Sequence, residues 1–238
     1  MKHYKFKKSK RNKIYLFWIL WLFILLIVCI TKHTWKTETE TEKQRTYDLP
    51  FSIDNSILRY VDAKHCLNKV DYVPVWLSFY TWANTVKERK IYLREEALNA
   101  FKKMNNKFKE KFGKNILIIS AYRPYGYQKK VYSKCKDKIF CAKPACSEHQ
   151  LGLAVDIIEI SDKDKFFEKE DNRKYYQWLK DNAYKYWFIN SYVNGIKIDT
   201  YPQEPWHRRY VWVWLAKYLH EKWINFAQYF YNVKGDYE

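Results

Sequence analysis

Glycine and proline are scarce in this sequence, which has 5 glycines and 6 prolines among 238 residues. So low a content excludes collagen-like and low-complexity disordered chains, which are rich in these residues. Hydrophobic residues make up 47% of the chain and aromatic residues 20%. Beyond an apolar N-terminal segment of about 30 residues, roughly 200 remain, which is enough for one domain with a real hydrophobic core. We therefore expect a single folded domain.

Acidic residues are also few, with 26 Asp and Glu against 44 Lys and Arg, and the net charge is +18. Residues 1–13 account for +7 of this charge and residues 31–238 for the remaining +11. A basic surface suits nucleic acid, anionic lipid headgroups or polyanionic wall polymers. Export across a membrane would disfavour nucleic acid. A solvated, Lys-rich surface without a specific partner is the alternative.

An uncharged run of 17 residues, 14–30, follows the basic tail at 1–13. This pattern predicts a transmembrane anchor with the N-terminus in the cytoplasm. A cleaved signal peptide also begins this way, but no small-x-small cleavage site follows the run. Cys29 could suggest a lipoprotein cysteine, although Val28 before it is bulkier than that processing usually accepts. We favour an uncleaved anchor, a polar spacer at 31–48 and a domain at 49–238.

Four cysteines lie beyond the predicted anchor, in what should be an oxidising compartment. A zinc site built from Cys135, Cys141, Cys146 and His149 is one interpretation, which the lack of a C-x-x-C pair disfavours. A disulfide that pins the loop before His149, such as Cys135 with Cys141 or Cys146, is favoured. With Cys66 included, the sequence does not fix which of three full pairings forms.

The apolar periodicity predicts an α+β domain, a small and largely antiparallel sheet flanked by helices. Helical patterns alternate with short β-like runs, and no internal repeat is present. The predicted helices are 91–111, closed by Gly113, a short one after Pro124, 171–184 and 214–231, and the predicted strands are 115–121, 153–158, 186–190 and 206–213.

Two segments carry residues typical of metal ligands, SEHQLGLAVDI at 147–157 and EPWHRRYV at 204–211. A catalytic zinc takes three protein ligands and keeps one position open, and His149, Asp156 and His207 supply this set. Asp156 lies in the apolar run LAVDII, where a buried charge needs a cationic partner. Gly152 allows the tight turn that would bring His149 and Asp156 to one ion.

Glu204 and Arg123 are the candidate catalytic residues around that ion. Pro205 disfavours a continuous helix through Glu204 and His207, so we expect a rigid turn that enters a strand. Glu204 is then free to act as general base and acid. Arg123 offers a bidentate fork for a substrate carboxylate or for the oxyanion of the transition state.

At these residues the chain resembles the VanY-type D-alanyl-D-alanine carboxypeptidase family of zinc peptidases. The resemblance extends from about residue 65 to 230 and rests on three motifs. The pattern S-x-H-x-x-G-x-A-x-D is met by Ser147, His149, Gly152, Ala154 and Asp156, the pattern E-x-W-H-x-R-Y-V by Glu204, Trp206, His207, Arg209, Tyr210 and Val211, and S-G-Y-R-S-Y-x-x-Q, with Ala and Pro for Gly and Ser, by Ser120 through Gln128.

The resemblance implies one zinc ion on His149, Asp156 and His207, catalysis by Glu204, and substrate contacts from Arg123, Gln128 and Ser147. Trp206 is either core or a wall of the cleft. The resemblance implies action on peptidoglycan stems, and the predicted anchor adds a bacterial membrane location with the domain facing the periplasm or cell surface. The sequence departs from the family at Lys185–Phe188, which reads K-Y-W-F where K-Y-G-F is usual, and in the cysteine-containing stretch 135–146.

Several alternatives stay open at this level. The same zinc chemistry fits a D,D-carboxypeptidase, an L,D-carboxypeptidase or a D-Ala-D-Ala dipeptidase. A non-catalytic wall-binding module would keep the fold but lose the base or a ligand, and this sequence retains both. A nucleic-acid binder would rest on the +11 charge alone, and we expect no nucleic-acid partner.

Overall fold

Four short strands form the sheet at the centre of the computed structural model, which describes residues 24, 26–28, 50–80, 90–157 and 168–234. The strand order is β3 (Ile118–Ser120), β4 (Ala154–Ile157), β6 (His207–Tyr210) and β5 (Phe188–Ile189), and every pair is antiparallel. Each strand falls within a predicted run but is shorter than predicted. The predicted α+β class is confirmed.

The chain divides into two units, residues 1–49 and 50–238. Within the described part of the chain, none of the helices combines the length and the hydropathy that a bilayer span requires. Of the anchor predicted at 14–30, only residues 24 and 26–28 belong to that part, and these are helical. The rest of the anchor and the spacer at 31–48 lie outside the described residues.

A second sheet, which the sequence did not predict, pairs β1 (Leu77–Tyr80) with β2 (Ile91–Arg94). The helix predicted at 91–111 is therefore wrong at its start, because residues 91–94 are a strand. Ile91 and Leu93 are buried while Tyr92 between them is exposed, which is the period of two of a strand. The helix α2 begins at Glu95 and ends at Phe112, and Gly113 caps it in the left-handed conformation, as predicted.

The C-terminal helix predicted at 214–231 is broken in two. Trp223 adopts a positive φ of 55°, ends the first helix and is 80% exposed, so it is not part of the buried stripe. Asn225 starts the second helix, because its side-chain oxygen accepts a hydrogen bond from the backbone N–H of Gln228. These two helices are α6 (Val213–Lys222) and α7 (Phe226–Lys234). The other helices are α3 (Tyr125–Lys134), α4 (Glu170–Asn182) and α5 (Ile196–Asp199), with 3₁₀ turns at Lys138–Phe140, Glu148–Leu151 and Ala183–Tyr186.

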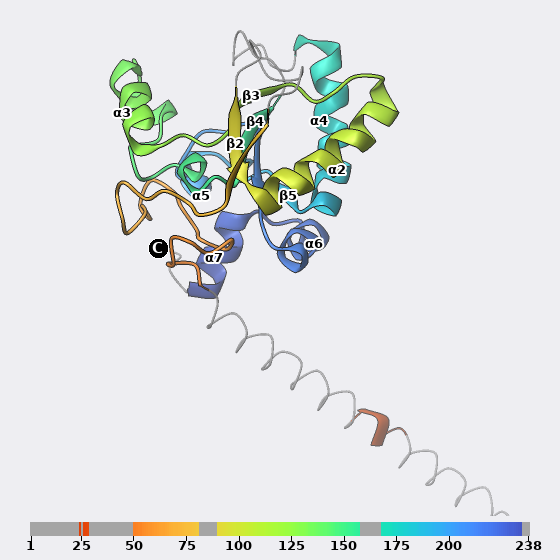
Figure 1. Cartoon of the computed structure of the whole chain (residues 1–238). Helices are drawn as coiled ribbons and strands as arrows, with labels where there is room; N and C mark the ends of the chain where they lie inside the picture. Colours follow the sequence, from red (N-terminus) through yellow and green to blue (C-terminus); the bar gives the residue numbers. More distant parts are fainter. Residues whose placement is uncertain (1–23, 25, 29–49, 81–89, 158–167, 235–238) are drawn as a thin grey trace, which may run out of the picture. The chain divides into compact units, whose positions relative to one another are not determined.

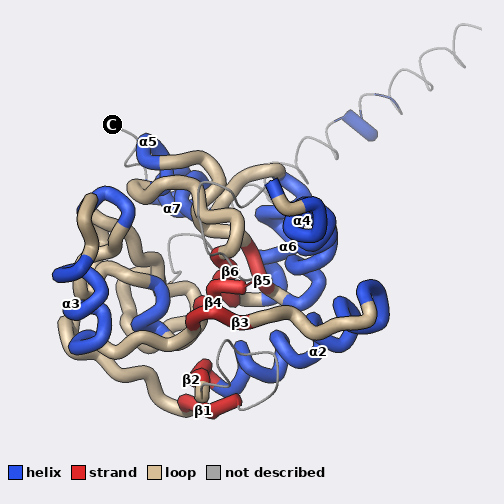
Figure 2. The backbone as a smooth tube through the Cα atoms, turned by 90° about the horizontal axis from the view of Figure 1, so that it is seen from above, coloured by secondary structure: helices blue, strands red, loops and turns tan. Residues whose placement is uncertain are grey.

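The main core lies between the sheet and the long helices. In Figure 2, α2, α4 and α6 gather to one side of the four strands and α3 lies on the other. The ring of Phe101 on α2 meets Phe188 of β5, and Phe108 meets Tyr175 and Trp178 of α4. Burial of these aromatic side chains supplies much of the apolar area that stabilises the domain. The opposite side, toward α3, is left for the cleft described below.

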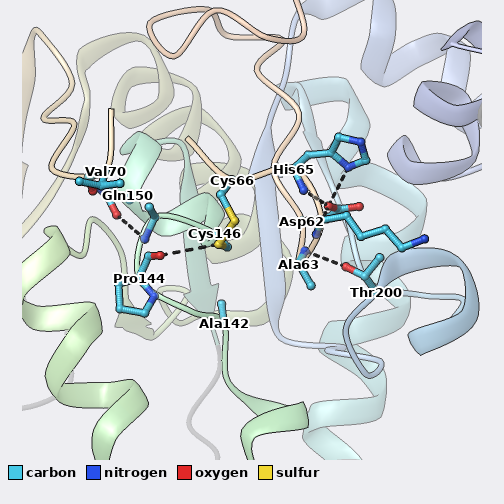
Figure 3. The surroundings of a disulfide bond; sticks show 12 residues. Asp62, Ala63, His65, Cys66, Val70, Ala142, Pro144, Cys146, Gln150 and Thr200 are labelled. Atoms are coloured by element: carbon cyan, nitrogen blue, oxygen red, sulfur yellow. Dashed lines mark hydrogen bonds and ion pairs between the residues drawn. A yellow bond between two sulfur atoms is a disulfide. The ribbon is translucent and has the colours of Figure 1, made fainter. Parts of the chain in front are cut away.

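The four cysteines beyond residue 49 form two disulfides, Cys66 with Cys146 and Cys135 with Cys141. The first joins the N-terminal segment of the domain to the loop that leads to the motif at 147–157 (Figure 3). Gln150 supports the same junction, since its side-chain amide donates to the carbonyl of Val70. With all four sulfurs paired, the alternative zinc site on cysteines has no thiolate ligands.

Candidate metal centre

The three predicted metal ligands converge on one point. One ligand atom from each of His149, Asp156 and His207 lies within 4.8 Å of the other two. Asp156 on β4 is the register partner of His207 on β6, so the antiparallel pairing sets these two side by side. His149 comes from the 3₁₀ turn just before β4.

Gly152 makes the turn between His149 and β4 possible. Its φ is +66°, and a Cβ at this position would lie 2.9 Å from Cδ2 of Leu77 and 3.1 Å from Cγ of Pro74. The predicted use of this glycine, a tight turn with close backbone approach, is confirmed. Its carbonyl accepts the backbone N–H of Arg94 at 2.8 Å, which ties the turn to the sheet of β1 and β2.

Each candidate imidazole lies at a distance from Asp156 that is close to the spacing of two ligands on one zinc ion. His149 Nε2 lies 3.2 Å from Asp156 Oδ2, and His207 Nδ1 lies 3.2 Å from Asp156 Oδ1. A zinc ion with bonds of about 2.0–2.2 Å places its ligands roughly 3.3–3.5 Å apart. Two nitrogens and a carboxylate that face one another at this distance need a proton or a cation between them, and this donor set suits zinc.

A second hydrogen bond fixes the orientation of each imidazole. His149 Nδ1–H donates to the carbonyl of Ala121 at 2.7 Å, which leaves Nε2 facing Asp156. His207 Nε2–H donates to Glu148 at 2.8 Å, which leaves Nδ1 facing Asp156. Both rings are thus held with one nitrogen directed toward Asp156, the side on which a metal would bind.

The carboxylates of Asp156 and Glu148 are ionised although little of either side chain is exposed. Burial raises the pKa of Asp156, but His149 and His207 outweigh it and hold that pKa well below its ordinary value. Burial likewise raises the pKa of Glu148, and the hydrogen bond from His207 together with the charge of Arg209 lowers it overall. Each carboxylate is therefore an acceptor at neutral pH.

The two imidazoles differ in charge. Burial and the nearby Arg123 lower the pKa of His149 to about 4, so its ring is neutral at pH 7. Burial also opposes the charged form of His207, yet hydrogen bonds to Asp156 and Glu148 raise its pKa to about 9. A cation at Nδ1 of His207 would take the place of that second proton.

Glu204 lies beside the three ligands, as predicted. Its Oε2 is 3.8 Å from His207 Nδ1, and its side chain is 20% exposed. Its backbone is held on both sides, because its N–H donates to the carbonyl of Tyr192 at 3.0 Å and its carbonyl accepts from the side chain of Asn190 at 3.1 Å. The predicted turn around Pro205 leads directly into β6.

Arg123 lies on the other side of Asp156. Its guanidinium is 3.5 Å from Asp156 Oδ2 and contacts the hydroxyls of Ser120 at 3.2 Å and Ser147 at 3.4 Å. The backbone N–H of Arg123 donates to the carbonyl of His149. Among the described residues, Arg123 Nε has no hydrogen-bond partner, so the side chain keeps a donor that the fold does not use.

These side chains line a cleft of about 540 Å³. Gln128 is buried at its wall, where its amide nitrogen donates to the carbonyl of Ala142 at 2.7 Å. Ser147 also lines the cleft. Trp206 belongs both to the hydrophobic core and to the cleft wall, so the two interpretations given for it hold together. The cleft thus joins every candidate site residue predicted from the sequence.

Sequence reasoning missed three residues of this site. Glu148 binds His207, Ser191 donates its hydroxyl to Glu148 at 2.8 Å, and the ring of Tyr192 lies 4.7 Å from the ring of His207. A buried acid between two motif residues is the only signal that the sequence offers for Glu148. Ser191 and Tyr192 occur in a stretch without a recognisable pattern.

Comparison with known proteins agrees with this geometry. The family model VanY, described as D-alanyl-D-alanine carboxypeptidase, matches residues 90–213, more than half of the chain. YodJ of Bacillus subtilis, named as a presumed carboxypeptidase, is 37% identical over 156 residues, 62% of this chain and 57% of YodJ. A D-alanyl-D-alanine carboxypeptidase of Enterococcus faecalis is 32% identical over 112 residues, 47% of this chain and 39% of that enzyme. The chain thus spans little more than half of YodJ.

Solved structures share the fold. The LD-carboxypeptidase LdcB superposes with a TM-score of 0.62 at 32% identity, covering 74% of this chain and 86% of LdcB. VanYB in complex with D-alanine-D-alanine superposes with a TM-score of 0.54 at 22% identity, covering 71% of this chain and 94% of VanYB, which shows the fold alone. The family match spans both metal-ligand motifs, and the chain therefore belongs to the VanY family of D-alanyl-D-alanine carboxypeptidases.

Proposed function

We propose that this protein is a zinc-dependent carboxypeptidase that removes the terminal D-alanine from peptidoglycan stem peptides. The observation that carries the proposal is the meeting of His149, Asp156 and His207 in a cleft that also holds Glu204 and Arg123. Relatives support the substrate class, because LdcB is described by its peptidoglycan recognition and an Enterococcus gallinarum relative as a D-Ala-D-Ala dipeptidase and carboxypeptidase.

The metal would be held by His149 Nε2, a carboxylate oxygen of Asp156 and His207 Nδ1. When bound there, zinc would supply Lewis acidity that activates water and polarises the scissile carbonyl. One anionic ligand among three leaves the centre with a net charge of +1, which preserves that acidity. A VanY structure in complex with Zn(II) has the same fold.

Glu204 is the residue that we assign to proton transfer. Its carboxylate takes a proton from the attacking water and delivers it to the leaving amine nitrogen of the departing D-alanine. The hydrogen bonds to Tyr192 and Asn190 fix its backbone, so the carboxylate stays beside the ligands. Trp206 and Pro205 follow it in a turn that offers little freedom.

Arg123 is assigned to the substrate. Arg123 lines the cleft, where its guanidinium binds the terminal carboxylate of the peptide or stabilises the oxyanion that forms at the carbonyl. Ser147 holds the guanidinium in place at 3.4 Å. Gln128 holds Ala142 in the wall of the cleft through its hydrogen bond, and Trp206 adds an apolar surface to the same cleft.

Defined muropeptides test the proposal. The purified full chain with zinc is incubated with pentapeptide stems, tetrapeptide stems and free D-Ala-D-Ala, and the products are followed by mass spectrometry. Release of D-alanine from a stem, lost on chelation and restored by zinc, is expected. Cleavage of the pentapeptide identifies D,D-activity, cleavage of the tetrapeptide L,D-activity, and cleavage of the dipeptide alone a dipeptidase. Binding without release would identify the wall-binding alternative.

We further propose that residues 14–30 anchor the protein in the cytoplasmic membrane of a bacterium, with the N-terminus inside and the domain outside. The basic tail before an uncharged run supports this topology, and the disulfides suit an oxidising compartment. Its partners would be stem peptides and, through the +11 charge, anionic lipid or wall polymers. Protease digestion of intact protoplasts should remove the domain, and protection would place it inside.

A further inference from the structure

Glu148 is a buried carboxylate that the proposed catalytic cycle does not use. It stands between Ser147 and His149, at a position that the S-x-H pattern leaves unspecified. Its side chain is 1% exposed, and Oε2 lies 2.8 Å from His207 Nε2 and 2.8 Å from the hydroxyl of Ser191. It therefore touches the ring of a metal ligand on the side opposite to the metal.

The contact sets which nitrogen of His207 carries the proton. A carboxylate accepts hydrogen bonds only, so His207 Nε2 must be protonated and the neutral ring must keep its lone pair on Nδ1. His149 has the opposite arrangement, because its Nδ1 donates to the uncharged carbonyl of Ala121. The two imidazoles thus differ in the partner behind them, one neutral and one anionic.

Glu148 also links His207 to the loop that holds Glu204. Ser191 donates to Glu148, and the next residue, Tyr192, accepts the backbone N–H of Glu204 at 3.0 Å. The same carboxylate therefore lies between a metal ligand and the support of the proposed base. Both groups that donate to it, the ring of His207 and the hydroxyl of Ser191, belong to buried residues.

We propose that Glu148 is a positioning residue that fixes the tautomer of His207 and strengthens that ring as a metal ligand. The inference rests on the proposed zinc function. An anionic partner raises the basicity of an imidazole ligand and locks its orientation, and removal of such a partner commonly weakens metal affinity by about 10- to 100-fold. The expected effect is on metal binding first and on activity through it.

Two substitutions separate charge from hydrogen bonding. Glu148→Gln keeps an acceptor for His207 Nε2–H but removes the charge, and Glu148→Ala removes both. In the full chain in detergent, zinc affinity measured by chelator competition should fall by about 10-fold for the first and up to about 100-fold for the second. The visible absorption of bound Co²⁺ should change in both variants, since it reports the ligand field directly.

Asp62→Asn is the matched control. Asp62 is another buried carboxylate, and it binds His65 Nδ1 at 2.9 Å (Figure 3). It is not among the residues that line the cleft. This variant should bind zinc as the wild type does, even if it unfolds at a lower temperature. Equal zinc affinity in the wild type and both Glu148 variants, or an equal loss in Asp62→Asn, would overturn the inference. A wild-type chain that binds no zinc would instead overturn the proposed function.

Discussion

At the scale of single residues, the chemistry of this site depends on where each proton lies. Three candidate ligand atoms face one point, and they belong to the neutral His149, the ionised Asp156 and the doubly hydrogen-bonded His207. Glu204 is not one of these three residues, and its Oε2 lies 3.8 Å from His207 Nδ1. At this distance its carboxylate can reach a water bound between them. Ligand and base roles should therefore separate on mutation.

Glu204→Gln tests this separation. The amide has the size of the carboxylate but cannot accept a proton, so kcat for D-alanine release should fall by about 10²- to 10⁴-fold. Zinc affinity should stay close to that of the wild type, because Glu204 is not a ligand. Stopped assays with the preferred stem peptide and chelator titrations of the same preparations give the two readouts. Release at the wild-type rate would refute Glu204 as the base.

The stability of the metal-free protein should fall as the pH rises from about 6.5 to about 9. The pKa of His207 is raised from 6.5 to about 9 in the folded state, so the folded state holds this proton more tightly than the unfolded state does. That contribution, of about 3 kcal/mol, is complete below pH 6.5 and is lost as the pH passes 9. Thermal unfolding of the chelated full chain across this range measures it.

His207→Gln is the reference for this pH series, because it lacks the titrating ring. Its unfolding temperature should vary less between pH 6.5 and 9 than that of the wild type. Parallel curves for the two proteins would show that other groups cause the dependence. In the wild type, zinc affinity should rise over the same interval, since the cation competes with the proton on Nδ1 of His207.

At the scale of elements, the turn between the 3₁₀ segment Glu148–Leu151 and β4 controls how His149 reaches Asp156. Gly152 holds this turn at a φ of +66° against Leu77 and Pro74. A side chain there would both strain the backbone and collide with β1. The candidate metal site and the sheet of β1 and β2 are therefore coupled through one residue.

Gly152→Ala should destabilise the protein by more than about 1 kcal/mol and weaken zinc binding, because the added Cβ meets Leu77 at 2.9 Å. Gly126→Ala is the matched control. Gly126 lies in α3, and a Cβ there meets nothing within 4 Å among the described residues, so this change should be neutral or stabilising by up to about 1 kcal/mol. Denaturant unfolding compares the two variants. A harmless Gly152→Ala would contradict the tight turn.

At the scale of the whole molecule, two disulfides constrain segments of very different length. Cys66 and Cys146 are 80 residues apart, whereas Cys135 and Cys141 are 6 apart. The long link ties the N-terminal segment of the domain to the loop before the metal ligands. The short one closes a loop beside the cleft, where Phe140 and Cys141 contribute to the wall.

Removal of the long link should cost more stability than removal of the short one. The chain-entropy model gives about 4.5 kcal/mol for a loop of 80 residues and about 2 kcal/mol for a loop of 6. Paired Cys→Ser variants of each disulfide, compared by guanidinium unfolding, test this order. A larger loss from the Cys135–Cys141 pair would show that native contacts, rather than loop closure, dominate.

Part of the fold was visible in the sequence, and part was not. Helix α2 and its Gly113 cap followed from local periodicity, because an amphipathic stripe is written in consecutive residues. The strand β2 was mistaken for the start of that helix, since four residues are too few to separate a period of two from one of 3.6. The break between α6 and α7 at Trp223 was not predicted, because a tryptophan rarely adopts a positive φ and its residue type therefore gives no sign of a helix end.

By itself, the sequence determined the chemistry of this protein: two imidazoles, two carboxylates and a guanidinium in three short motifs, because donor types are properties of residues. Only the tertiary structure decided that Asp156 lies opposite His207, that Glu148 lies behind the His207 ring, and that Cys66 pairs with Cys146. These are contacts between residues 51 to 80 positions apart. Strand register and chain packing create such contacts, and local sequence periodicity does not predict them.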